Sequence, residues 1–268
     1  MTMSRRPKLS RDQLFELFVE EGREILRTEG LGSIGEVLTF RRVADQVEDA
    51  VGIRIARGSI IGRVWPTLVD YQTDVLVAIA ADEGNAEMEE VTAHLISLAT
   101  TIDTSSVEAR WSGLREMRRV GAAASIDALS RSHDWSLWIG VWAITAVGTA
   151  PERHRKVECA LRQSYLSATD RMAGAYEMVN KLVGFRPRPG LTVRQYAIAV
   201  AALAEGCVLR NRVDAAQMTG IWRSSGPNKQ PTEWTLFGLA VDALGQAFFE
   251  PDPDWLPVPH GAPSASVK

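Results

Sequence analysis

The part of this 268-residue chain that most constrains its fold lies between Ala50 and Val69. This stretch contains no acidic residue, and its basic residues are Arg54, Arg57 and Arg63. A small basic helix over 57–64 would suit the major groove of DNA, where arginine can pair with guanine and glycine lets the backbone approach closely. The alternative is that these arginines form an ordinary solvated surface, and composition alone does not separate the two readings.

A helix boundary follows this stretch directly. Pro66 disfavours helical geometry at the residue before it, Trp65. Thr67 with Asp70 three positions later has the pattern of an N-cap and an acidic first turn. The sequence therefore predicts a break after the basic helix and a new helix from Thr67 to about residue 81.

Two further helices are expected upstream. Ser10 and Gln13 form a capping-box pattern, and apolar residues then recur at helical spacing to about Glu29. Three glycines within 30–35 predict a loop. Thr39 is the next expected N-cap, before a short amphipathic helix with arginines in its first turn.

Three short helices with basic residues on the second and third form a helix-turn-helix pattern, in which the third helix reads base edges and the second crosses the phosphates. The acidic residues concentrate on the first helix and can face away from DNA. The expected DNA-contacting residues are Arg41, Arg42, Arg54, Arg57, Ser59, Ile60, Gly62 and Arg63.

The rest of the chain also has a helical pattern, so the predicted fold class is all-α. Polar residues at 224–231 predict a turn, and no β-rich alternation of convincing length is present. The expected helical segments are 86–102, 106–130, 134–147, 152–183, 192–213 and 232–249. We expect a DNA-binding head over 1–82, a helical body over 83–250 and a flexible Pro-rich tail over 251–268.

Composition excludes several classes of protein. A formal net charge of -3 argues against sequence-indifferent coating of nucleic acid. Two cysteines far apart favour a reduced, cytoplasmic compartment. The longest uncharged stretch, 135–151, is short for a membrane span. No pattern of metal ligands or catalytic residues is found, and no cofactor, metal or membrane partner is expected.

The order of these patterns resembles the TetR family of bacterial transcriptional repressors. The Trp65 position usually holds Phe in the family, and Ile61 and Gly62 replace an aromatic residue that is usual in the middle of the recognition helix. The loops before Thr39 and Gly58 are also longer than usual. The matching segments are 14–18 with 21–22, 40–44, 57–59, 65–67 with Tyr71, 201–206 with 209–210, and 234–237.

The resemblance implies a homodimer whose interface is formed by helices near 192–213 and 232–249. It also implies an effector pocket in the middle of the chain, where aromatic residues are frequent. The alternative is that these side chains are ordinary helical core. The candidate ligand-binding residues are Trp111, Trp138, Trp142, Tyr165, Met172 and Tyr176.

The leading hypothesis from the sequence is a ligand-responsive repressor that binds a palindromic double-stranded operator as a homodimer. A small lipophilic effector would release it from DNA. One alternative is a helical small-molecule-binding protein or enzyme with no role on DNA. Another is a regulator that binds a partner protein in place of DNA.

Overall fold

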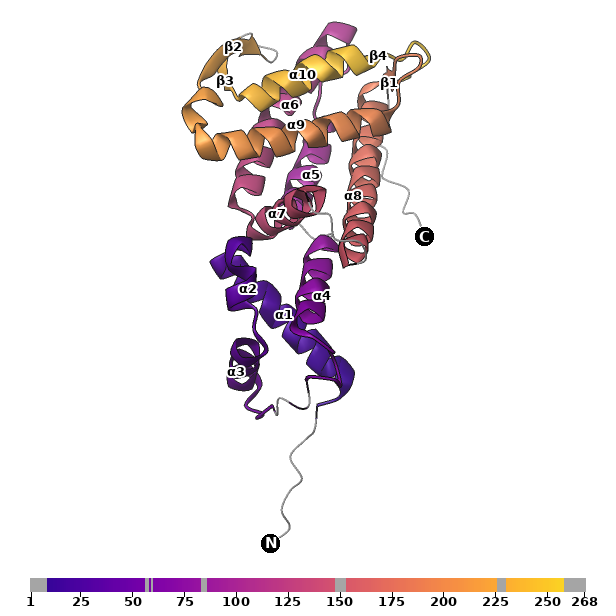
Figure 1. Cartoon of the computed structure of the whole chain (residues 1–268). Helices are drawn as coiled ribbons and strands as arrows, with labels where there is room; N and C mark the ends of the chain where they lie inside the picture. The colour runs from indigo at the N-terminus through magenta and orange to yellow at the C-terminus, as the bar shows by residue number, and fades with distance from the viewer. Residues whose placement is uncertain are drawn as a thin grey trace. The chain divides into compact units, whose positions relative to one another are not determined.

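The computed structural model describes residues 9–55, 58, 60–82, 86–147, 153–225 and 230–257. The described elements fall into two compact units, which are taken one at a time below (Figure 1). Unit 1 comprises residues 1–84 and 133–166, and unit 2 comprises residues 85–132 and 167–268. The predicted all-α class is confirmed, because helices make up the framework of both units and the strands are short.

Unit 1 is built from helices that begin where the sequence predicts. Ser10 and Gln13 form a capping box, and so do Thr67 and Asp70. The Thr39 hydroxyl accepts a hydrogen bond from the Arg42 backbone N–H. The elements are α1 (Arg11–Glu29), η1 (Leu31–Ser33), α2 (Ile34–Val37), α3 (Phe40–Val51), α4 (Leu68–Ala80), α7 (His133–Val147) and the first half of α8 (Arg153–Val183).

Two local predictions for unit 1 are wrong. The glycine-rich segment 30–35 is not a plain loop, because it contains η1 and the start of α2. The predicted helix over 57–64 is also wrong for residues 60–64, which form turns. Gly62 has a φ of 80°, outside the helical region, and its N–H donates to the Trp65 carbonyl at 2.9 Å.

An aromatic cluster forms the centre of unit 1. Trp65 is 2% exposed and Tyr71 is fully buried, with their rings 4.9 Å apart and edge to face. The Trp65 ring also stacks on Phe15 at 5.4 Å, and its Nε1–H donates to Asp74 Oδ2 at 2.8 Å. The Tyr71 hydroxyl donates to the Phe18 carbonyl at 2.8 Å. These contacts fix α4 and the segment before it against α1.

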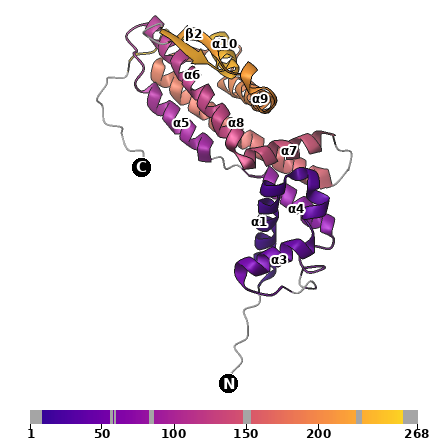
Figure 2. The same cartoon turned by 90° about the vertical axis from the view of Figure 1, so that its left-hand side faces the viewer.

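Unit 2 is a helical layer structure with two small antiparallel strand pairs. Its α5 and α6 lie side by side, and α9 and α10 pack on α6 and on each other (Figure 2). Its helices are α5 (Ala86–Ala99), α6 (Val107–Arg131), the second half of α8, α9 (Val193–Val213), η3 (Ala215–Gln217) and α10 (Leu236–Phe248). Its strands are β1 (Phe185–Pro187), β2 (Ile221–Ser225), β3 (Gln230–Trp234) and β4 (Phe249–Pro251), paired β1–β4 and β2–β3.

The β2–β3 hairpin corrects the prediction of a polar turn followed by a helix from residue 232. Ile221 pairs with Trp234, and Trp234 is 2% exposed. The last helix therefore begins only at Leu236, after Thr235 as N-cap. A hairpin of five-residue strands has too little alternation to stand out in the sequence, because its burial depends on α6 and α10.

The chain after α10 is held to unit 2 as far as residue 257, where the sequence suggests a flexible tail from 251 onward. The Asp252 N–H donates to the Gly184 carbonyl at 3.0 Å. The Trp255 Nε1–H donates to the Lys181 carbonyl at 2.8 Å, and the buried Arg110 guanidinium lies 4.8 Å from the Trp255 ring centre. The predicted tail over 258–268 lies outside the described residues.

The two units do not coincide with the predicted head and body. The first break, at residues 84–85, is close to the predicted boundary at 82. Residues 133–166, which the sequence placed in the body, pack in unit 1, where α7 contacts both α1 and α4. The helix α8 contributes residues to both units.

We expect Gly22→Ala to destabilise unit 1. A Cβ built on Gly22 would overlap the Tyr71 hydroxyl and lie 2.8 Å from a Val75 methyl carbon, so α1 would have to move away from α4. Overpacking of this kind costs about 1–3 kcal/mol of unfolding free energy, measurable by urea denaturation. Gly35→Ala is the control, because its Cβ meets nothing within 4 Å. Equal stability of both variants would contradict the packing described here.

Candidate DNA-contacting surface and buried cavity

The first turn of α3 carries two of the predicted DNA-contacting arginines. Arg41 is exposed, and among the described residues it has no ion-pair or hydrogen-bond partner. Arg42 is half-buried and is paired with Glu29 at the end of α1, with Nη1 3.2 Å from Oε2. Arg41 is therefore available to a phosphate, whereas Arg42 would have to leave an existing ion pair.

The segment between α3 and α4 carries the remaining candidates. Arg54 and Arg63 are exposed, and no described residue pairs with either guanidinium. The Arg63 carbonyl accepts a hydrogen bond from Arg11 Nε at 3.2 Å, which attaches this segment to the start of α1. Gly62 is exposed and is held in its left-handed turn.

One predicted base contact is wrong. Ile60 is fully buried in the core of unit 1, because the Val64 and Trp65 N–H groups both donate to its carbonyl and draw the turn inward. Arg57 and Ser59 lie outside the described residues. The structure therefore leaves Arg41, Arg54 and Arg63 as the described arginines of this surface that are exposed and unpaired.

The six predicted ligand-binding residues are divided equally between the two units. Trp138, Trp142 and Tyr165 belong to unit 1, where Trp138 donates to Ser164 Oγ at 3.2 Å and packs against Trp142 at 5.0 Å. The remaining three, Trp111, Met172 and Tyr176, belong to unit 2. Of the six, Tyr176 lines the cavity described next.

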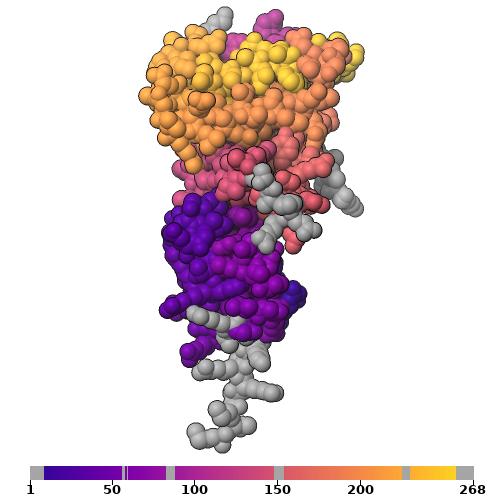
Figure 3. Space-filling view, viewed as in Figure 1, coloured from indigo at the N-terminus to yellow at the C-terminus, as the bar shows by residue number. Residues whose placement is uncertain are grey.

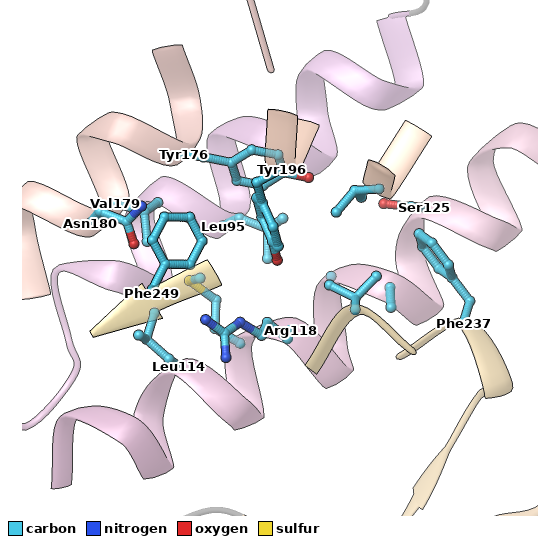
Figure 4. Close-up of a pocket in the computed structure, with 15 residues that line it drawn as sticks. Leu95, Leu114, Arg118, Ser125, Tyr176, Val179, Asn180, Tyr196, Phe237 and Phe249 are labelled. Atoms are coloured by element: carbon cyan, nitrogen blue, oxygen red, sulfur yellow. The ribbon is translucent and has the colours of Figure 1, made fainter. Parts of the chain in front are cut away.

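Unit 2 contains a partly open cavity of about 70 Å³, lined by residues of α5, α6, α8, α9 and α10 (Figure 4). This is far below the roughly 300 Å³ at which drug-sized ligand sites begin. Most of its wall is apolar, with Leu114, Val179 and Phe249 among the lining residues. The polar residues that line it are Arg118, Ser125, Tyr176, Asn180 and Tyr196.

Arg118 is a buried cation at the edge of this cavity, with 7% of its surface exposed. Its Nη1 lies 3.3 Å from Oδ1 of Asp242, which is also buried. Arg115 Nε lies 3.4 Å from the other carboxylate oxygen, Oδ2, and Gln246 donates to that oxygen at 2.8 Å. A Cβ on Gly245 would overlap the Arg118 guanidinium, so a larger residue there would force that side chain to shift.

Sequence reasoning missed this buried pair. Arg118 and Asp242 are 124 positions apart, and each lies in a helix that also carries other charged or polar residues. No local spacing identifies such a pair. The close approach of α10 to α6 brings the two residues together. Within the sequence of α10, Gly245 is the residue that indicates this close approach.

Burial raises the pKa of three of the four tyrosines. It raises the pKa of Tyr71 in unit 1, and it raises the pKa of Tyr176 and Tyr196 beside the cavity. The positive charge of Arg118 opposes part of this effect at both tyrosines in unit 2. These phenols therefore stay neutral to a higher pH in the folded chain than in the unfolded chain.

Other kinds of site find no support in the described part of the chain. Its His, Cys, Asp and Glu side chains form no group of three or more that could hold a metal ion. Among the same residues, no helix is both long enough and apolar enough to cross a membrane.

Comparison with known proteins finds similarity among solved structures. No protein-family model matches the chain, and no curated protein sequence matches it. The chain is similar to SmeT, the repressor of the Stenotrophomonas maltophilia multidrug efflux pump SmeDEF, over 94% of this chain and 98% of that chain. The sequence identity is 17% and the TM-score is 0.41.

We expect alkaline unfolding to be coupled to ionisation of the buried tyrosines. Unfolded tyrosines ionise near pH 10. Because the folded pKa values are raised, the stabilisation is complete below about pH 10 and is lost as the pH rises above it. Phenolate absorbance from three tyrosines should appear together with the loss of helical circular dichroism. Tyr176→Phe should remove one tyrosine from that step. Ionisation of all the tyrosines in a fully helical protein would contradict the burial.

Proposed function

We propose that this chain is a DNA-binding transcriptional repressor that acts as a homodimer on a palindromic operator. The observation that carries the proposal is the presence of three exposed, unpaired arginines, Arg41, Arg54 and Arg63, at the start of α3 and in the segment that follows it. Exposed guanidinium groups on a fixed scaffold are suited to phosphate oxygens and to guanine edges.

The aromatic cluster supplies the fixed scaffold. Trp65 is held by stacking, by its hydrogen bond to Asp74 and by its contact with Tyr71. Arg63 lies two residues before it, in a turn closed by the Gly62–Trp65 hydrogen bond. Because the described part of this segment is a turn and not a helix, we propose that it meets DNA through Arg63 and the exposed backbone at Gly62.

Charge on α3 defines which part of that helix would face DNA. Asp45 and Asp49 are exposed in its later turns and would be repelled by phosphates. Arg41 is exposed in its first turn, where the helix dipole also favours an anion. We therefore propose that α3 approaches the DNA backbone with its N-terminal end.

Replacing Arg41 and Arg63 with alanine should weaken binding to DNA from the chain's own upstream region. Each lost phosphate contact should lower the slope of log affinity against log salt by about 1, because fewer counterions are released. Fluorescence anisotropy over a salt series measures this directly. We expect a loss of at least tenfold in affinity near physiological salt, with the circular dichroism spectrum unchanged.

The matched control is the pair Arg155→Ala and Arg162→Ala on α8. Both residues are exposed in unit 1, and their removal changes the net charge by the same amount. The control should bind as the parent does. Equal losses in the two double variants would mean that net charge alone drives binding. No binding by the parent chain would favour the alternative of a helical small-molecule-binding protein.

The proposed dimer interface is the exposed face of α9 and α10. On α9, Ala202, Gly206, Leu209 and Val213 are exposed and share one face at helical spacing. Leu236 at the start of α10 is 44% exposed. Figure 3 shows α9 and α10, in orange and yellow, lying together on one side of unit 2. Burying small and apolar residues between two copies would allow the close helix packing expected at a two-fold axis.

Leu209→Glu should weaken the dimer at least tenfold, which corresponds to about 1.4 kcal/mol. Sedimentation velocity over a concentration series measures the dissociation constant. The control is Ile144→Glu on α7 in unit 1, because Ile144 and Leu209 are almost equally exposed at 46% and 45%. A parent chain that stays monomeric at all concentrations, or a variant that dimerises as the parent does, would exclude this interface.

The cavity of unit 2 is the proposed effector site. Tyr176 and Asn180 on α8 line it, and α8 also supplies residues to unit 1. A ligand that changes the position of α8 would therefore act on a helix whose first half belongs to unit 1. Release of operator DNA by that ligand is the regulatory step of this proposal.

A further inference from the structure

We propose that the cavity of unit 2 binds a small organic carboxylate with a short apolar tail, through Arg118 and Asn180. The inference deepens the proposed effector site and rests on that proposed function for its regulatory meaning. Binding itself can be tested without DNA. Figure 4 shows the two side chains reaching the same cavity from different helices, Arg118 from α6 and Asn180 from α8.

The first argument is the sign of the charge. Arg118 is the charged residue among the described residues that line the cavity, and no carboxylate is among them. Behind this wall, one carboxylate, Asp242, faces two guanidinium groups, those of Arg118 and Arg115. The Arg115 side chain is 41% exposed, so water partly screens its charge. The Arg118 side chain is buried, so its charge is not screened in this way. The net charge beside the cavity is therefore positive, which favours an anionic ligand over a neutral or cationic one.

The second argument is an unused hydrogen-bond donor. Asn180 is 6% exposed, and its Nδ2 is buried without any hydrogen-bond partner. A buried donor without an acceptor is destabilising, because it has lost its hydrogen bonds to water without gaining another. A carboxylate oxygen is an acceptor only, so it can take the Asn180 N–H while its second oxygen faces Arg118. A ligand without an oxygen acceptor would leave the donor unsatisfied.

The third argument concerns size and the rest of the wall. The cavity holds about 70 Å³, less than half of the roughly 150 Å³ cavity that binds benzene. The rest of the lining is mostly aliphatic and aromatic. An acid of a few carbon atoms therefore fits, with its tail against that surface. This volume limits the small lipophilic effector expected from the sequence to a few carbon atoms.

The test uses the full-length chain and three acids, acetate, propanoate and butanoate, at constant ionic strength. Each acid is compared with the alcohol of the same carbon number. Isothermal titration calorimetry and the shift in unfolding temperature measure binding. At least one acid should bind saturably and raise the unfolding temperature, and its alcohol should bind at least tenfold more weakly.

The decisive variant is Asn180→Asp, which keeps the shape of the side chain and places a negative charge at the cavity. It should weaken the acid at least tenfold and leave the alcohol unchanged. Asn211→Asp on α9 is the control, because Asn211 does not line the cavity and the net charge changes equally. Arg118→Lys, which keeps the charge but loses the planar guanidinium, should weaken the acid less than Asn180→Asp does.

The proposal is overturned if none of the three acids binds, if acid and alcohol bind alike, or if Asn180→Asp binds the acid as the parent does. Operator affinity, measured in parallel with and without acid, separates this inference from the proposed function. Acid binding that leaves DNA affinity unchanged supports the site and contradicts its regulatory role. Absence of DNA binding contradicts the proposed function and leaves the binding assay intact.

Discussion

The burial of Trp65 is the constraint on which unit 1 depends. Its ring is stacked between α1 and α4 and contacts Tyr71, while its indole N–H is satisfied by Asp74. A side chain of this size contributes more apolar burial than most core residues, and its single polar atom has a partner. Because Arg63 lies two residues before Trp65 and Thr67 two residues after it, the same anchor fixes a candidate DNA-contacting residue and the start of α4.

Unit 2 contains a different kind of contact, the buried carboxylate of Asp242 facing the two guanidinium groups of Arg115 and Arg118. Arg118 and Asp242 join α6 to α10, and Gly245 gives the guanidinium its space. Buried pairs are rarely a large source of stability, since the desolvation of both groups opposes their attraction. The pair is better explained by what Arg118 provides at the cavity, a charged donor beside the unpaired amide of Asn180.

The sequence predicted the parts of the fold that depend on local chemistry. The caps at Ser10, Thr39 and Thr67 are confirmed because each needs only a hydroxyl and a backbone N–H three residues later. The prediction of a helix over 57–64 was wrong at residues 60–64. Gly62 adopts a left-handed turn there, and Ile60 and Trp65 pack in the core against helices distant in the sequence. The aromatic residues of 111–176 divided between two cores, since helical spacing does not reveal which core a face meets.

The central claim is that the surface around α3 and Arg63 recognises operator DNA as part of a two-fold dimer. Hydroxyl-radical footprinting of the full-length chain on its own upstream region tests it most directly. The account predicts two protected segments on one face of the duplex, with centres one helical turn of about 10 base pairs, or a whole multiple of it, apart. Uniform protection, a single protected segment, or no protection at concentrations where the dimer is complete would contradict it.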